Sequence, residues 1–517
     1  MNFVQALLKP EAYPHAVKEI QLVQTHISWV FLTGEFVYKI KKPVNFGFLD
    51  FATLEKRHHF CQEELRLNRR LSPEIYLEVV PIVQRDGGIY VGGEGKVIDY
   101  AVKMKQLPQE SCLISLLERK KLTAFIMERL ARLMARFYKE AKTSKEIATY
   151  GLPEKIEVNI KENFDQTASY VGKTIEKDVY EALKDYSFRF LTERKEVFLE
   201  RICAEQIKDG HGDFHCANVY WHNNKIYVLD CIEFNTRFRY ADVAADVAFL
   251  LMDLDFRQAS HLGNCFLNAY LTYTNDFGLL KVLDFYKIYR AYVRGKIASF
   301  EMDMAEIPET QRKQAQEKAK RYFELAYRYL TAPKRPFILA MTGLLGSGKS
   351  TLACQLAPVL KAVLIRSDAL RKHLAGLDPD EHVYVPFGQG IYRPEMTEKV
   401  YAALFRIAEE VLAQGLPVIL DASFSKEKWR TEVKELAKKM NCPYFFIECE
   451  CPEEVLKQRL VLRYKNGGDV SDGHPALLET FKKDFEPIQD KHKITVNTAR
   501  DVKEAVEEVK KVLEGSV

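Results

Sequence analysis

A glycine-rich run in the second half of the chain has the residues needed to bind the phosphates of a nucleotide. Residues 343–350 read Gly-Leu-Leu-Gly-Ser-Gly-Lys-Ser, between a predicted strand (337–342) and a predicted helix (351–360). Glycine lets the backbone pass close to phosphates, and the N–H groups at a helix N-terminus attract anions. Lys349 can then reach the β- and γ-phosphates, and Ser350 can offer its hydroxyl to Mg²⁺. The run predicts a site for ATP and Mg²⁺, with nucleotide contacts from Gly343, Gly346, Ser347, Gly348, Lys349, Ser350 and Thr351.

Charged residues also follow two other predicted strands of this region. Asp421 comes directly after the apolar stretch 417–420. Asp368 and Arg371 lie on the first turn of a helix that follows the stretch 362–366. Because the carboxyl ends of parallel strands meet at one edge of a sheet, these side chains are expected beside the glycine-rich run. Asp421 is a candidate Mg²⁺ ligand, Asp368 a candidate base for a hydroxyl, and Arg371 a candidate cation for the acceptor. The alternative is that the acids only end a strand and cap a helix.

A pair of arginines is spaced to act from a mobile segment. Arg459 and Arg463 lie four residues apart on a predicted helix, followed by the glycine-containing stretch 465–469. Arginines carried by a closing lid would neutralise the transferring phosphoryl group and exclude water. The alternative is that both are solvated surface cations.

Taken together, these residues resemble the P-loop kinases that include polynucleotide 5′-kinases, gluconate-type sugar kinases and zeta-toxin-like kinases. The resemblance covers residues 336–517. It implies phosphoryl transfer from ATP to a hydroxyl, with Asp368 activating the acceptor, Arg371 binding it, and Lys349 and Arg463 assisting catalysis. The segment 384–394 is expected near the acceptor but matches no motif.

A second group of candidate residues lies in the first half of the chain. Residues 211–218 read His-Gly-Asp-Phe-His-Cys-Ala-Asn, and Asp230 ends the predicted strand 226–229. Two acids and an amide in this order can orient a hydroxyl and hold Mg²⁺ on ATP. Upstream, Lys39 and Lys41 share one face of a predicted hairpin strand, where they need an anion. Glu64 falls on the apolar stripe of the predicted helix 53–71, where a carboxylate needs a cation.

This second group resembles the aminoglycoside phosphotransferase and choline kinase branch of the protein-kinase-like fold. The resemblance covers residues 20–330 and is specific at 211–246. It implies Asp213 as catalytic base and Asn218 and Asp230 as metal ligands. It also implies a phosphate clamp of Lys39 with Glu64, with Lys41 as the second choice, and Asp242 and Asp246 as braces of the catalytic loop. Two alternatives are a purely structural loop and a domain that binds nucleotide without turnover.

The element pattern predicts two domains of different class. The stretch 330–336, with two prolines and two cations, separates a domain at residues 1–330 from one at 337–517, with a linker at 331–336. The first domain is expected to be α+β and protein-kinase-like, with strands first and long helices later. The second is expected to be an α/β P-loop domain with a parallel sheet, because short apolar strands alternate with helical patterns.

The composition restricts the partners of this chain. Its 517 residues carry 76 basic and 72 acidic side chains, a net charge of +4, which gives no strong field toward nucleic acid or membrane. The start of the chain has no long apolar run, and the ten cysteines form no C-x-x-C pair, so a cytoplasmic protein without a zinc site is expected. The leading hypothesis is a kinase with two ATP sites and small-molecule hydroxyl acceptors. The alternatives are a polynucleotide 5′-hydroxyl kinase and a nucleotide-binding regulatory or toxin-related module.

Overall fold

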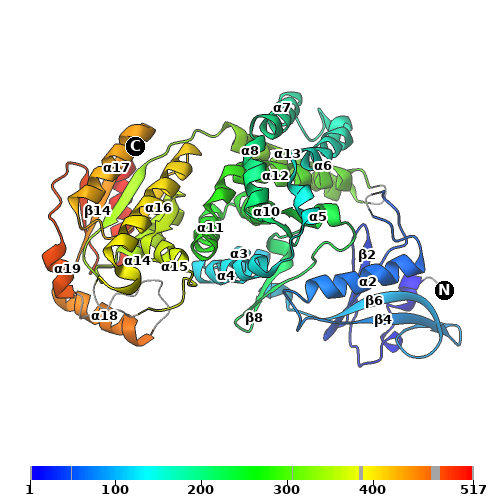
Figure 1. Ribbon diagram of the computed structural model, residues 1–517. Coiled ribbons are helices and arrows are strands. Elements are labelled where there is room, and N and C mark those ends of the chain that lie inside the picture. Colours follow the sequence, from blue (N-terminus) through cyan, green and yellow to red (C-terminus); the bar gives the residue numbers. More distant parts are fainter. Residues whose placement is uncertain (1–2, 48, 305–306, 384–387, 467–477, 515–517) are drawn as a thin grey trace. The chain divides into compact units, whose positions relative to one another are not determined.

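The protein forms two compact units. The computed structural model describes residues 3–47, 49–304, 307–383, 388–466 and 478–514 (Figure 1). The first unit comprises residues 1–122, 136–253 and 285–320, and the second comprises 123–135, 254–284 and 321–517. Three stretches that precede residue 331 therefore belong to the second unit. The predicted domain boundary at 331–336 remains a prediction.

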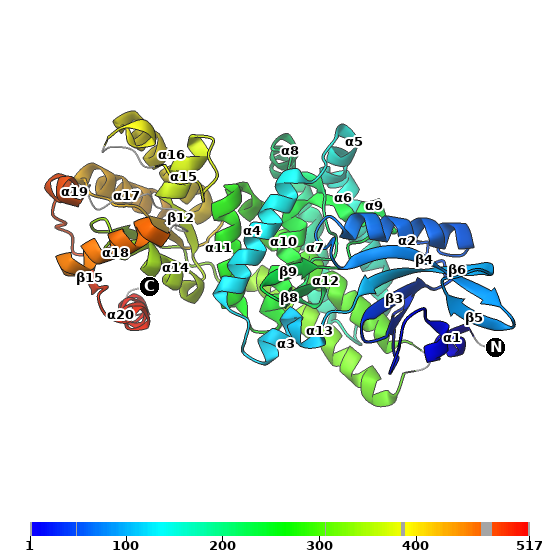
Figure 2. The ribbon, with the colours of Figure 1, turned by 90° about the horizontal axis from the view of Figure 1, so that it is seen from below.

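The first unit contains a six-stranded antiparallel sheet. Its order is β1 (Gln21–Gln24), β2 (Ser28–Leu32), β3 (Phe36–Lys41), β6 (Lys96–Lys105), β4 (Tyr76–Arg85) and β5 (Gly88–Val91). Helix α2 (Leu54–Asn68) packs on β4 and β6 and lies along the sheet in Figure 2. It begins at Thr53, whose side chain accepts a hydrogen bond from the Lys56 N–H. Cys61 of α2 packs with Val37 and Val102 of the sheet, which places the helix face that carries Glu64 against β3.

The remainder of the first unit is mostly helical. The hairpin of β8 (Val219–His222) and β9 (Lys225–Val228) turns at Asn223 and Asn224, both of which have positive φ, as a two-residue type I′ turn requires. Strands β7 (Ile207–Asp209) and β10 (Tyr240–Asp242) pair antiparallel. Besides α2, the helices of at least six residues in or entering this unit are α3 (Leu113–Glu118), α4 (Ala124–Glu140), α6 (Pro153–Thr167), α7 (Lys177–Glu193), α8 (Lys195–Cys203), α10 (Val243–Phe256), α12 (Leu280–Met302) and α13 (Glu309–Thr331). The α+β class expected for this region is confirmed.

The second unit is built on a five-stranded parallel sheet, as predicted. Its order is β12 (Val363–Arg366), β13 (Val418–Asp421), β11 (Ile338–Thr342), β14 (Tyr444–Glu450) and β15 (Lys493–Asn497). Strand β15 was not among the predicted strands. Helices α14 (Lys349–Leu360) and α20 (Val502–Glu514) pack together, and their apolar side chains share a core cluster with β11, β14 and β15. Helices α16 (Pro394–Ala413) and α17 (Glu427–Met440) also pack on the sheet.

The outer edge of strand β12 is covered by a helix that comes much earlier in the chain. Asn268 of α11 (Ser260–Thr274) donates to the Ala362 carbonyl at 3.0 Å and accepts from the Leu364 N–H at 2.8 Å. The Asn264 amide also donates to the Ala362 carbonyl, at 3.2 Å. The amide side chains thus pair with an edge strand that would otherwise expose backbone groups. Within the described ranges, no helix is both long and apolar enough to cross a membrane.

Candidate nucleotide-binding sites

The glycine-rich loop joins β11 to α14, the strand and helix that flank it as predicted. Gly343 has φ +132°, and a Cβ there would lie 2.5 Å from the Cys449 carbonyl oxygen, so only glycine fits. The Lys349 Nζ donates to the carbonyls of Gly343 and Leu344 at 2.9 and 2.8 Å, which closes the loop around the ammonium group. The Ser347 hydroxyl is buried and has no hydrogen-bond partner within the described parts of the chain. The loop therefore surrounds the lysine with backbone and contains one buried hydroxyl that has no hydrogen-bond partner among the described residues.

Asp421 and Ser350 meet directly beside Lys349. Asp421 is the last residue of β13, the strand next to β11, and Ser350 is in the first turn of α14. Burial raises the pKa of the Asp421 carboxyl, an effect that outweighs the opposing influences of Arg366, of the Ser350 hydrogen bond and of Lys349. The Arg366 Nε lies 3.4 Å from the Asp421 carboxylate. Arg366 was not singled out from the sequence, although it directly precedes the helix that carries Asp368.

Asp368 and Arg371 lie on α15 (Ser367–Leu374), which starts directly after β12. Burial is the main cause of the raised pKa of Asp421, and the charge of Asp368 adds to it. Arg371 is buried, donates to the Ile391 carbonyl at 2.9 Å, and places its guanidinium 4.7 Å from the centre of the Tyr392 ring. Arg371 thus contacts the segment 388–394, part of the stretch expected near the acceptor. Its contact with an acceptor remains a prediction.

The arginine pair falls on α18 (Glu453–Asn466). The Arg459 guanidinium donates to the Thr498 carbonyl at 2.6 Å and lies against Gly348, where an added Cβ would be 3.1 Å from its Nη1. A pocket at this place is lined by Gly346, Gly348, Thr351, Leu352, Arg459, Leu462, Thr498, Arg500, Val502 and Ala505. Arg463 is in α18, but its side chain and the stretch 467–469 of the predicted lid lie outside the described residues.

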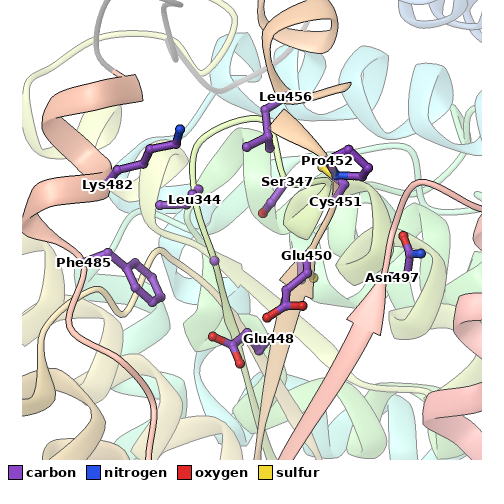
Figure 3. A pocket seen from close by; sticks show the side chains of 12 residues that line it. Leu344, Ser347, Glu448, Glu450, Cys451, Pro452, Leu456, Lys482, Phe485 and Asn497 are labelled. Carbon is purple, nitrogen blue, oxygen red and sulfur yellow. The ribbon is translucent and has the colours of Figure 1, made fainter. Parts of the chain in front are cut away.

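A second pocket lies at the start of the loop, where β14 ends. Figure 3 shows its lining, with the Ser347 hydroxyl and the carboxylates of Glu448 and Glu450 on one side and Lys482 and Phe485 on the other. Glu448 pairs with Lys493 at 2.8 Å, and Lys482 pairs with Glu453 at 2.5 Å. The lining does not include the candidate residues Lys349, Asp368 and Asp421. The pocket shares Gly343, Leu344 and Ser347 with the glycine-rich loop.

The first unit brings its two predicted lysines and two predicted acids into one network. The Lys39 Nζ lies 2.8 Å from Glu64 and also contacts Asp230, and the Lys41 Nζ lies 2.8 Å from the other oxygen of Glu64 and also contacts Glu233. Burial opposes ionisation of Glu64, but the two lysines outweigh it and lower the pKa of that carboxyl to about 2. The sequence analysis gave Lys41 as the second choice after Lys39 for the partner of Glu64. Both lysines pair with Glu64 in the structure, and the role of either in holding phosphate remains a prediction. Glu233 was missed, although it follows Asp230 by three residues.

Asp213 and Asn218 lie in the loop between β7 and β8. The Asn218 amide donates to the Asp213 carboxylate at 3.0 Å and to its carbonyl at 2.9 Å, and the His215 Nε2 lies 3.4 Å from the same carboxylate. Burial opposes ionisation of Asp213, but His215 and more distant cations outweigh it and lower the pKa of the carboxyl well below its usual range. Asp213 is therefore an anion over the whole physiological pH range. Leu229 donates its N–H to the Asn218 carbonyl at 2.8 Å, which ties this loop to the segment that carries Asp230.

The two residues predicted as braces, Asp242 and Asp246, contact the loop at residues 211–218 or the elements beside it. Asp246 accepts the N–H groups of His211 and Gly212 at 2.8 and 2.9 Å, and also the Tyr138 hydroxyl at 2.9 Å. Asp242 instead accepts two hydrogen bonds from Arg201, at 2.8 and 2.7 Å. Asp246 therefore fixes the loop directly, whereas Asp242 fixes the start of the helix that carries Asp246.

Comparison with known proteins gives the following relations. The AAA domain family matches residues 338–488. An uncharacterised protein of Mycobacterium tuberculosis (strain H37Rv) is 28% identical over 467 residues, which cover 90% of this chain and 91% of that protein. An adenylyl-sulfate kinase of Myxococcus xanthus is 34% identical over 130 residues, 24% of this chain and 62% of that enzyme. A solved structure of a gluconokinase from Sinorhizobium meliloti is 22% identical, has a TM-score of 0.26, and covers 36% of this chain and all of that one (100%).

The family match and the loop geometry agree on the second unit. Residues 338–488 match the AAA domain family, and they carry the P-loop between β11 and α14. The match begins with β11 and includes the glycine-rich loop, Asp368 and Asp421. These comparisons do not identify the N-terminal unit.

Proposed function

We propose that the P-loop domain is an ATP-dependent kinase that transfers the γ-phosphate to a hydroxyl of a small molecule. The observation that carries this proposal is the meeting of Ser350 and Asp421 beside Lys349, with Asp368 at the end of the adjoining strand. A motor-type ATPase needs no second carboxylate for an acceptor, whereas transfer to an alcohol requires a group that takes its proton.

The residues present fit Mg²⁺ and ATP. A hydroxyl and a carboxylate are the donors that Mg²⁺ takes in P-loop proteins, where phosphate oxygens and water complete its shell. No cluster of three or more His, Cys, Asp and Glu suited to a metal is found in the parts of the chain that the structure describes, so the nucleotide itself would have to complete the site. The buried Ser347 hydroxyl, which lacks a partner within those parts, and the glycine cradle fit a phosphate chain in the same way.

Each residue then has a task in the transfer. Lys349 exchanges the loop carbonyls for the β- and γ-phosphates and holds them in line with the acceptor. Asp368 orients the acceptor hydroxyl and takes its proton as the acceptor oxygen bonds to the γ-phosphorus, while the bond from that phosphorus to the bridging oxygen breaks and ADP leaves. The Arg459 and Thr498 pocket receives the base and ribose of the nucleotide, next to Thr351. Bound Mg²⁺ supplies charge neutralisation between the β- and γ-phosphates.

The proposed class of acceptor is supported by the net charge of the chain and by its similarity to a known kinase. A nearly balanced net charge supports a small acceptor over a nucleic acid, and the curated adenylyl-sulfate kinase is a relative of this chain. A polynucleotide 5′-hydroxyl kinase is the alternative, because such an enzyme needs only a short cationic tunnel.

We further propose a second nucleotide site in the N-terminal unit, with a phosphotransferase-like arrangement. Lys39 and Glu64 form the phosphate clamp, Asn218 and Asp230 are the Mg²⁺ ligands, and Asp213 is the base. The first support is the ion-pair network that joins β3, α2 and the segment after β9. The second is Asp213, whose carboxylate accepts a hydrogen bond from the Asn218 side chain and has a lowered pKa. A domain that binds nucleotide to regulate its neighbour, without turnover, is the competing proposal.

Single substitutions separate these proposals. Lys349→Ala should abolish phosphate transfer by the P-loop domain, and Asp368→Asn should abolish it while ATP still binds. Asp213→Asn should remove a second activity that survives Lys349→Ala. A wild-type chain that binds Mg·ATP but transfers phosphate to no metabolite or oligonucleotide would favour a regulatory module.

A further inference from the structure

The N-terminal network contains more charges than a phosphate clamp needs. One lysine and one carboxylate suffice to hold phosphates, yet here Glu64 binds two lysines, one through each of its oxygens, at 2.8 Å in both cases. The two lysines differ in their access to solvent: the Lys39 side chain is 13% exposed and that of Lys41 is 1% exposed. Only Lys39 can therefore touch a ligand, and Lys41 must act through its neighbours.

Lys41 connects the clamp to the segment that carries the candidate metal ligand. Its Nζ contacts Glu233, whose side chain is 5% exposed, as well as Glu64, and it lies 4.9 Å from the centre of the Phe51 ring. Glu233 follows Asp230 by three residues along a segment without regular structure. The ion pair between Lys41 and Glu233 therefore fixes the end of this segment to strand β3.

The segment held by this ion pair begins at a residue with an unusual backbone conformation. Asp230 has φ +65°, a left-handed backbone that non-glycine residues seldom adopt and that persists only where the surroundings hold it. Two hydrogen bonds hold the near end of the segment, from the Asp230 N–H to the Tyr76 hydroxyl at 3.1 Å and from the Cys231 N–H to Asn68 at 2.9 Å. Glu233 supplies the anchor at the far end.

Lys41 also determines which oxygen of Glu64 is left to pair with Lys39. Because one oxygen of Glu64 is bound to Lys41, Lys39 meets only the other, and its Nζ remains beside Asp230. Without Lys41, both oxygens could turn to Lys39 and draw its ammonium group away from the place of the phosphates. We propose that Lys41 and Glu233 are positioning residues of the N-terminal site, which set Lys39 and Asp230 at the spacing that Mg·ATP requires. This inference rests on the proposed second nucleotide site.

The test compares paired neutral substitutions in a full-length chain that carries Lys349→Ala, so that the P-loop site does not contribute. Lys41→Met with Glu233→Gln removes both charges and leaves no buried ion of this pair uncompensated. The matched control is Arg57→Met with Asp99→Asn, which removes another buried pair, formed at 2.9 Å between helix α2, which also carries Glu64, and strand β6 of the same sheet. Binding of a non-hydrolysable ATP analogue is measured by calorimetry with and without Mg²⁺, and folding by thermal melting.

We expect the Lys41 and Glu233 pair to weaken Mg²⁺-dependent binding by about tenfold to a hundredfold, the worth of a charged hydrogen bond, while the control pair leaves it unchanged. If the doubly substituted protein does not fold, Lys41→Arg, which keeps the charge, should retain binding, and Glu233→Gln alone should weaken it. Folded variants that bind as the parent does overturn the positioning role. A Lys349→Ala parent that binds no nucleotide overturns the second site itself, and the positioning role with it.

Discussion

The two candidate sites differ in the groups that would bind phosphate. In the P-loop domain the phosphate cradle is backbone, with one lysine held by two carbonyls of its own loop, so the cradle is one continuous stretch of sequence. In the N-terminal unit it is a set of side-chain charges from β3, α2 and the segment after β9, and Lys39 and Asp230 are separated by 191 positions. A backbone site depends on glycine at particular positions, whereas a site of buried side chains depends on the balance of its charges.

The two sites also differ in the pKa of their candidate acids. Asp213 is surrounded by His215, Asn218 and more distant cations, which keep it ionised. Asp421 is buried with fewer compensating charges, so its pKa is raised. As the pH falls, Asp421 of the P-loop site should therefore be protonated before Asp213 of the N-terminal site.

The largest effect is expected where the backbone cradle is closed. Gly343→Ala places a Cβ 2.5 Å from the Cys449 carbonyl and should abolish nucleotide binding by the P-loop domain, measured by calorimetry in a Lys39→Met background, in which binding by the N-terminal site is weakened. Gly376→Ala is the control, because Gly376 also has positive φ (+74°) but has open space at the Cβ position. Equal binding by both variants would show that the loop does not form the cradle.

A charge removed from the N-terminal network should have the next largest effect. Lys39→Met removes the partially exposed lysine, its ion pair with the buried Glu64 and the cation beside the half-exposed Asp230, so Mg·ATP binding in a Lys349→Ala background should fall about a hundredfold, as for loss of a charged contact of ~3 kcal/mol to a buried carboxylate. The P-loop activity, measured in the chain with Lys349 intact, should not change. Loss of both activities would contradict the independence of the sites.

A smaller effect should separate the two sites by pH. Protonated Asp421 cannot bind Mg²⁺, and its pKa is raised, so kcat/KM of the P-loop site at limiting Mg²⁺ should fall on acidification before that of the N-terminal site. Asp213 has a lowered pKa and stays ionised to lower pH. The measurement uses Asp213→Asn and Lys349→Ala chains, each of which leaves one site. Coincident pH profiles would contradict the contrast between the acids.

The smallest effect concerns the scaffold of the P-loop domain. Asn268→Ala removes two hydrogen bonds from the edge of β12 and leaves the Leu364 N–H unpaired, so the free energy of unfolding should fall by about 1–3 kcal/mol. Asn264→Ala removes one longer bond and should cost less. Denaturant unfolding checks both. Equal and negligible losses would show that α11 does not stabilise the sheet edge.

The sequence predicted the P-loop site because its residues are contiguous and flanked by elements of clear type. It also predicted that Asp368 and Asp421 follow strands that end at the same sheet edge as the loop, since parallel strands end at one edge. The role of Asn268 could not be predicted, because an amide on a helix pairs with a strand almost a hundred residues away. For the same reason the network of Lys41 and Glu233 was missed: spacing along one element shows which residues share a face, but not which distant charge meets them.

The most direct test of the central claim is phosphate transfer by the intact chain. Cell extract is incubated with ATP, Mg²⁺ and wild-type, Lys349→Ala or Asp368→Asn protein, and products that gain the mass of one phosphoryl group are identified. We predict at least one small-molecule product that requires both Lys349 and Asp368. A full set of wild-type products formed equally well by the Lys349→Ala and Asp368→Asn proteins would contradict the assignment of the P-loop domain as the kinase.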